Sequence, residues 1–131
     1  MIEFLNSLGE KEISLEERAG REEMVPFVVI VRHPPFYAEL ILEYSICELQ
    51  QLTKHFQAML MFLEESTFVF SSIGREMTMS FLMSKTCHIE AEVFINADTR
   101  GYMRFMFDFD QSFLKRIIEQ VRDIIKLNTE R

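Results

Sequence analysis

Residues 76–109 read EMTMSFLMSKTCHIEAEVFINADTRGYMRFMFDF, and apolar residues recur at every second position through most of this stretch. Such alternation is typical of β-strands that are buried on one face only. Turn-forming residues stand at Gly74 and at 98–101, where they divide the pattern into short segments. The strands that we expect here are Thr67–Ser71, Glu76–Ser84, Cys87–Asn96 and Tyr102–Phe109.

The same alternation assigns the side chains of these strands to two faces. The face expected to be buried is apolar and carries Met77, Met79, Phe81, Met83, Ile89, Ala91, Val93, Ile95, Met103, Phe105, Phe107 and Phe109. The opposite face is expected to be polar and carries Glu76, Thr78, Ser80, His88, Glu90, Glu92, Arg104 and Asp108. This division predicts an antiparallel sheet with one face on the core and the other in water.

Two amphipathic helices flank this region. Ser45 and Glu48 have the spacing of a capping box and predict a helix to about Glu64, with Met61 and Phe62 widening its apolar stripe. Asp110 can cap a second helix from Gln111 to about Leu127. The apolar stripe of the second helix consists of Leu114, Ile117, Ile118, Val121, Ile124 and Ile125.

The first 45 residues predict further strands. Residues 1–24 form a charged lead-in, within which an edge strand is expected around Glu12–Ala19. The β-branched run Pro26–His33 predicts a strand covered on both faces. A turn at Pro34 and Pro35 should lead into a returning strand, Phe36–Tyr44.

The order of these elements predicts an α+β fold with a mainly antiparallel sheet and two helices packed on one face. A chain of 131 residues is the usual size of one domain, so we expect residues 1–131 to share one core. We find no internal repeat in the sequence. Whether the protein forms a homo-oligomer cannot be read from these patterns.

Composition argues against several classes of function. The net charge of -7 is unfavourable for binding the phosphates of nucleic acid. No apolar run reaches the 18 to 20 residues or so of a membrane span, and the first residues do not resemble a signal peptide. Cys47 and Cys87 fit no disulfide or CxxC pattern, so we expect buried thiols and a cytoplasmic location.

His88, Glu90 and Glu92 form the constellation that most resembles a chemical site. Their spacing of two places all three on one face of a strand, where they could ligate a metal ion. Alternating charges are also the usual outcome on a solvated sheet face. Because no other catalytic motif is evident, we predict no metal, no cofactor and no enzyme activity. The residues expected to bind a partner are Glu76, His88, Glu90, Glu92, Arg104 and Asp108.

Residues 49–127 resemble the WapI-like immunity proteins of bacterial contact-dependent toxin systems. The resemblance consists of a Leu/Phe-patterned helix, short alternating strands and an aromatic strand that runs into the start of the last helix. That junction reads Phe107-Asp108-Phe109-Asp110-Gln111-Ser112-Phe113-Leu114 here. A helix cap at Asp110 explains the same residues without any functional role. The resemblance implies a cytosolic protein that neutralises a cognate toxin by occluding it.

Two functions therefore remain in view. The first is a non-catalytic immunity protein that covers a basic toxin domain with an acidic surface. The second is a small-ligand or metal-assisted enzyme site on the polar face of the same sheet. A deep pocket with convergent polar groups would favour the second function, whereas a filled core and a broad acidic surface would favour the first.

Overall fold

The computed structural model describes residues 1–19, 23–62, 66–96 and 101–130. The strands are β1 (Ile2–Leu5), β2 (Lys11–Glu17), β3 (Met24–His33), β4 (Phe36–Ser45), β5 (Ser66–Ser71), β6 (Met77–Met83), β7 (His88–Asn96) and β8 (Tyr102–Asp110). The helices are α1 (Ile46–Phe62) and α2 (Leu114–Thr129), and a 3-10 turn, Gln111–Phe113, precedes α2. None of the described helices is long and apolar enough to cross a membrane.

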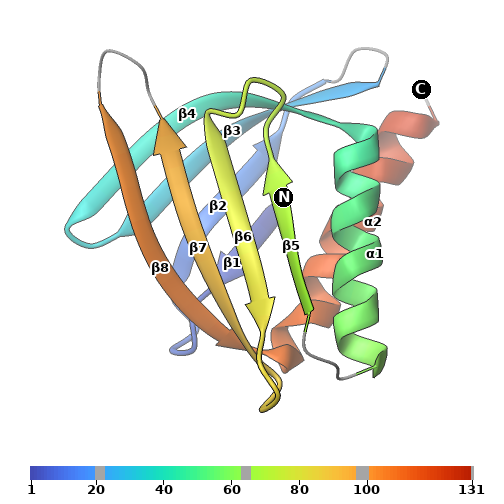
Figure 1. Ribbon diagram of the computed structural model, residues 1–131. Helices are drawn as coiled ribbons and strands as arrows, with labels where there is room; N and C mark the ends of the chain where they lie inside the picture. Colours follow the sequence, from blue (N-terminus) through green and yellow to red (C-terminus); the bar gives the residue numbers. More distant parts are fainter. Residues whose placement is uncertain (20–22, 63–65, 97–100, 131) are drawn as a thin grey trace.

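The strands are all antiparallel, and they form two sheets where we expected one. Strands β1–β4 form one four-stranded sheet in sequence order, and β5–β8 form the other. Figure 1 shows the β5–β8 sheet in front of the β1–β4 sheet, with both helices together along one side. The predicted α+β class is confirmed, and the second sheet supplies a partner for the apolar face of the first.

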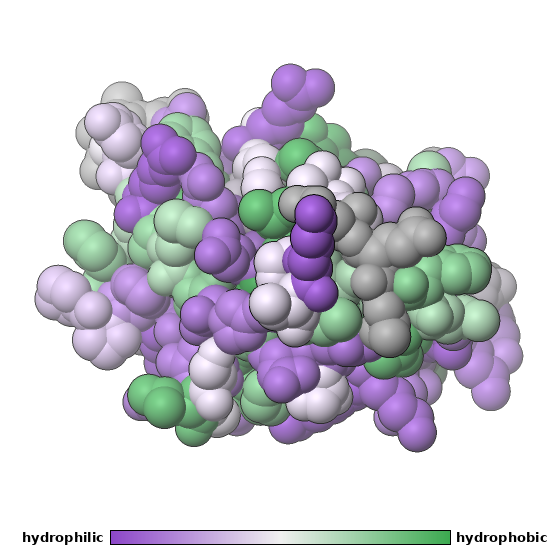
Figure 2. All heavy atoms as spheres, turned by 60° about the horizontal axis from the view of Figure 1, so that its bottom comes forward, coloured by the Kyte–Doolittle hydropathy of each residue, from purple (hydrophilic) through white to green (hydrophobic). Residues whose placement is uncertain are grey.

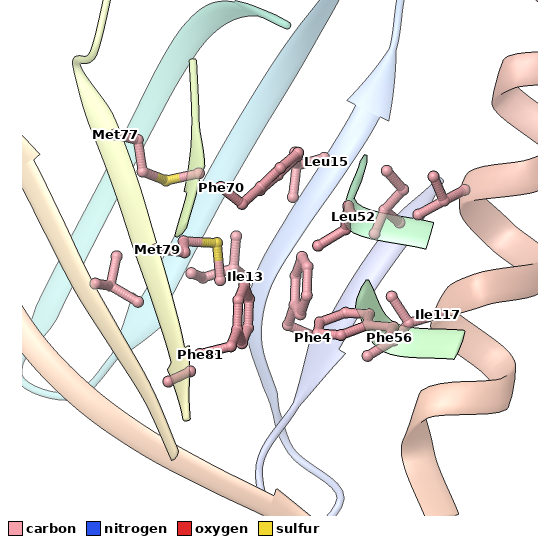
Figure 3. Packing of buried hydrophobic residues seen from close by; sticks show 14 of the residues in the cluster. Phe4, Ile13, Leu15, Leu52, Phe56, Phe70, Met77, Met79, Phe81 and Ile117 are labelled. Carbon is pink, nitrogen blue, oxygen red and sulfur yellow. The ribbon is translucent and has the colours of Figure 1, made fainter. Parts of the chain in front are cut away.

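The hydrophobic core lies between the two sheets and extends to the helices. Figure 3 shows side chains from β1, β2, β5, β6 and both helices converging in this space. Aromatic contacts join the sheets directly. Phe4 stacks on Phe81 with ring centroids 5.7 Å apart, and Tyr44 stacks on Phe70 at 4.6 Å. These contacts account for the period-two burial pattern in both halves of the chain.

The two helices pack on each other. Each helix also packs against a strand of the sheet that does not precede it in the chain. Helix α1 follows β4 but packs on β5, and α2 follows β8 but packs on β1. The second contact includes polar groups, because the Glu3 backbone N–H donates to Gln120 Oε1 at 2.9 Å. Arg116 also forms an ion pair with Glu3 at 2.8 Å. The two halves of the chain therefore hold each other in place.

The structure contains an internal repeat that the sequence analysis did not find. Each half is a four-stranded meander followed by a helix, β1–β4–α1 and then β5–β8–α2. The buried helix positions correspond at a constant interval of 65 residues: Leu49 with Leu114, Leu52 with Ile117, Phe56 with Val121, and Met59 with Ile124. The strand register also corresponds, because Val25 faces Tyr44 on β3–β4 as Ile89 faces Phe109 on β7–β8.

Residues 1–24 differ most from the prediction. The expected lead-in contains β1, whose Ile2 and Phe4 are fully buried. The strand predicted at the sheet edge is β2, which pairs with β1 on one side and β3 on the other. Its Glu12 is only 5% exposed and accepts hydrogen bonds from Asn6 Nδ2 and, at 2.8 Å, from His33 Nδ1. A buried carboxylate with two donors needs no solvent.

The helix starts are partly as predicted. Ser45 Oγ accepts from the Glu48 backbone N–H at 3.0 Å, which is one half of the capping box. The Glu48 carboxylate, however, accepts from the Ser71 N–H at 2.9 Å and so ties α1 to β5. Asp110 caps as expected, although the N–H that it accepts, from Ser112, belongs to the 3-10 turn.

Some side chains that we expected to be buried are not, and Met103 and Ile125 are buried only in part. Met61 and Phe62 at the end of α1 are 63% and 66% exposed, so they do not widen its buried stripe. Cys47 is exposed and Cys87 is half-buried. Cys47 lies in the first turn of α1, and Cys87 lies in the β6–β7 turn with a positive φ of 62°.

Candidate protein-binding face

Five of the six predicted site residues share one surface. His88, Glu90 and Glu92 project from β7, and Arg104 and Asp108 project from β8, all away from the core. We call this surface, with the outward side chains of β5 and β6, the outer face of β5–β8. Glu76 lies immediately before β6, where its carboxylate accepts from Ser72 Oγ at 3.0 Å. A role for Glu76 in binding a partner stays a prediction.

One end of the outer face carries a hydrogen-bonded chain of three side chains. His88 Nε2 lies 2.8 Å from Asp108 Oδ2, and Ser7 Oγ lies 3.0 Å from Asp108 Oδ1. The hydrogen bonds from His88 and then from Ser7 lower the pKa of the Asp108 carboxyl below its ordinary value. Asp108 stands between His88 and Ser7, so the histidine does not contact the hydroxyl that it would have to activate in a catalytic triad.

The middle of the outer face has one paired and one unpaired carboxylate. Arg104 forms an ion pair with Glu92 across β7 and β8. Glu90 is exposed and makes no ion pair with any residue that the structure describes. It stands directly opposite Asp108 in the strand register. Like charges in directly opposed positions destabilise a sheet, so this pair has a local energetic cost.

A shallow hollow of about 250 Å³ lies on the outer face next to these carboxylates. Its apolar lining includes Val69 from β5, Leu82 from β6 and Met106 from β8, which are 57%, 38% and 53% exposed. Glu90 and Glu92 line the same hollow. The outer face is therefore more apolar than the sequence indicated, and it combines hydrophobic side chains with carboxylates.

Sequence reasoning missed the apolar residues of the hollow for an identifiable reason. Val69, Leu82 and Met106 stand at the outward positions of their strands, where we looked for polar residues. Apolar residues at positions that alternation assigns to solvent could have indicated a hydrophobic surface here. Ser7 was also missed, and no pattern could have indicated it, because it lies in the β1–β2 turn and reaches Asp108 from the other sheet.

The proposed metal ligands do share a face, as their spacing predicted. Two of the three are held by other side chains, since His88 contacts Asp108 and Glu92 contacts Arg104. Within the described ranges, no three His, Cys, Asp or Glu residues are grouped closely enough to hold a metal ion.

Figure 2 shows another side of the molecule, the end that points down in Figure 1. Hydrophilic side chains cover most of the coloured surface there, and the hydrophobic ones form small, separate patches. No protein-family model and no curated protein matches this chain.

Proposed function

We propose that this protein is a non-catalytic binding protein that covers a basic surface of another protein with the outer face of β5–β8. The observation that carries the proposal is the combination of unpaired Glu90 with the exposed apolar Val69, Leu82 and Met106 around one hollow. Protein interfaces combine apolar contact with charge complementarity in this way. An immunity protein that occludes a cognate toxin, as the sequence resemblance implies, is the specific role that we propose.

The charge distribution supports a basic partner. The protein has a net charge of -7, and the outer face carries the carboxylates Glu90, Glu92 and Asp108 beside Arg104 and His88. Long-range attraction between an acidic face and a basic partner accelerates association and weakens as salt rises. The opposed carboxylates Glu90 and Asp108 also support the proposal, because local rules of stability are commonly broken at functional surfaces.

The test uses the protein encoded by the adjacent gene as the first candidate partner. We expect calorimetry to show a one-to-one complex. The association rate constant should decrease as the salt concentration is raised. Glu90→Lys should raise Kd about tenfold or more, which corresponds to about 1.4 kcal/mol. The matched control is Glu39→Lys, an equivalent charge reversal at an exposed position on β4 of the other sheet.

Two results would contradict the proposal. One is a complex that Glu39→Lys weakens and Glu90→Lys does not, since binding would then use the β1–β4 sheet. The other is a stoichiometric transition metal in the purified protein whose binding requires His88, because this would favour the metal-assisted site. Circular dichroism of each variant checks that the fold is retained.

A further inference from the structure

We propose that the hollow on the outer face of β5–β8 receives one long basic side chain, lysine or arginine, from the partner. This inference rests on the proposed function and specifies which chemical group the face recognises. The hollow joins two kinds of surface: Val69, Leu82 and Met106 provide apolar contact, and Glu90 provides a carboxylate. Lysine and arginine have the same two parts in one side chain, an aliphatic stem and a cationic end.

The hollow has room for one such side chain. Its volume is about 250 Å³, and it opens on the surface of the sheet, so a side chain can enter without displacing the core. Phe68 and Phe81, on the strands beneath the hollow, turn their side chains into the core, where the two rings stack at 5.2 Å. The floor of the hollow is therefore held in place by core packing, which reduces the entropy lost on binding.

The charges in the hollow favour one cation. Glu92 is already paired with Arg104, which leaves Glu90 as the carboxylate without an ion pair among the described residues. The neighbouring Asp108 accepts from His88 and Ser7 but retains its negative charge opposite Glu90. A cation between the hollow and Glu90 would relieve this repulsion, whereas a neutral side chain would leave it in place.

The hollow contains its own spectroscopic probe. Met106 lines it and is 53% exposed, so its ε-methyl group reports directly on anything that enters. The experiment labels methionine methyl groups with carbon-13 and assigns the Met106 signal from its loss in Met106→Leu. Three blocked tripeptides, Gly-Lys-Gly, Gly-Arg-Gly and Gly-norleucine-Gly, are then titrated into the labelled full chain.

We expect the lysine or the arginine peptide to shift the Met106 methyl signal in a saturable way, and the comparison of the two shows which cation fits. The uncharged norleucine peptide, which keeps an aliphatic stem, should bind at least about tenfold more weakly. Glu90→Gln should weaken the charged peptide to a similar degree. Glu39→Gln on the other sheet, the matched control, should leave the titration unchanged.

The inference is overturned if the Met106 signal does not respond to either charged peptide, or if norleucine binds as well as they do. An equal response in the native protein and in Glu90→Gln would also overturn it. These failures are distinguishable from failure of the proposed function. If Glu90→Lys still disrupts the partner complex, the outer face binds the partner by some other contact, and only the assignment of the hollow is lost.

Discussion

The two halves of the molecule follow the same path, but their outer faces differ in chemistry. Opposite pairs on β3–β4 are Pro26 with Glu43 and Val28 with Ile41. The corresponding pairs on β7–β8 are Glu90 with Asp108 and Glu92 with Met106. The register that brings these pairs together is the same in both sheets.

This difference separates what the fold requires from what it leaves free. Most inward positions in both halves are apolar and fully buried, because the two sheets pack on each other there, and only a few, such as Ala38, Leu40 and Met103, are partly buried. Outward positions are aliphatic with scattered charges in the first half and acidic with a hollow in the second. The packing of the two sheets explains the inward residues, but it does not explain the opposed acids Glu90 and Asp108 of the second half.

The largest effect that we predict tests the equivalence of the buried helix positions. Leu52→Ala in α1 and Ile117→Ala in α2 should each destabilise the protein by about 2–5 kcal/mol, because each removes a fully packed side chain and leaves a cavity. Urea denaturation measures both values. Arg122→Ala, on the exposed side of α2, should cost less than about 0.5 kcal/mol. If only one of the core variants is severe, the halves do not contribute equally to the core.

A smaller effect distinguishes two equivalent aromatic residues. Tyr44 and Phe109 end their strands at matching positions, and both are fully buried. The Tyr44 hydroxyl has no hydrogen-bond partner among the described residues, and burial raises its pKa well above the ordinary value. Tyr44→Phe should therefore stabilise the protein by about 1 kcal/mol.

The reciprocal variant, Phe109→Tyr, should cost about 1–3 kcal/mol, because it buries a hydroxyl where the native residue has none. Thermal denaturation of the two variants in the same buffer gives the comparison. A loss of stability in Tyr44→Phe would show that an ordered water satisfies the hydroxyl. The positions of Tyr44 and Phe109 would then be less alike than their packing suggests.

The repulsion on the outer face should be measurable as a stabilisation. Glu90→Gln should raise the free energy of unfolding by about 0.2–1 kcal/mol at low salt, since it removes one of two opposed negative charges. The gain should shrink as salt is added. Glu43→Gln is the control on the first sheet, where the opposite residue is Pro26. An equal gain in both variants would mean that net charge is responsible, and not the opposed pair.

The smallest effect concerns acid. The pKa of Asp108 is lowered in the folded state by its hydrogen bonds to His88 and Ser7, so the ionised carboxylate favours folding. Its contribution is complete above the unfolded pKa of about 3.9 and is lost as pH falls through the lower, folded value. In Asp108→Asn, the free energy of unfolding should therefore fall less steeply as pH is lowered through this range. The difference should be small, because the Asp108–His88 pair is exposed and screened by solvent. Carbon-13 titration should also show the Asp108 pKa rising in His88→Ala.

The sequence predicted most elements because alternation and helical spacing report burial directly. The strands β5–β8 agree with the prediction to within one residue at each end, and most of the predicted inward residues are buried. Strand β1 was missed because its alternation covers only four residues in an acidic segment. The division into two sheets could not be predicted, since alternation shows that a face is buried but not which strands pair or what covers them.

The candidate site was predictable only in part for the same reason. Spacing placed His88, Glu90 and Glu92 on one face, and the structure agrees. The contacts that distinguish them depend on β8 and on the β1–β2 turn, which are distant in sequence. Asp108 is 20 residues from His88 and 101 residues from Ser7. No local pattern carries information about such contacts.

Each helix packs on a strand of the other half, and this arrangement has a consequence for how the protein folds. Strand β1 is held by α2 through Glu3 and Gln120, which are 117 residues apart. Closing so long a loop costs entropy that is recovered only when both sheets and both helices are in place. Folding should accordingly be slow for the size of the chain and cooperative between its halves. During synthesis, α2 is made after both sheets and α1, and until it emerges β1 lacks its native cover.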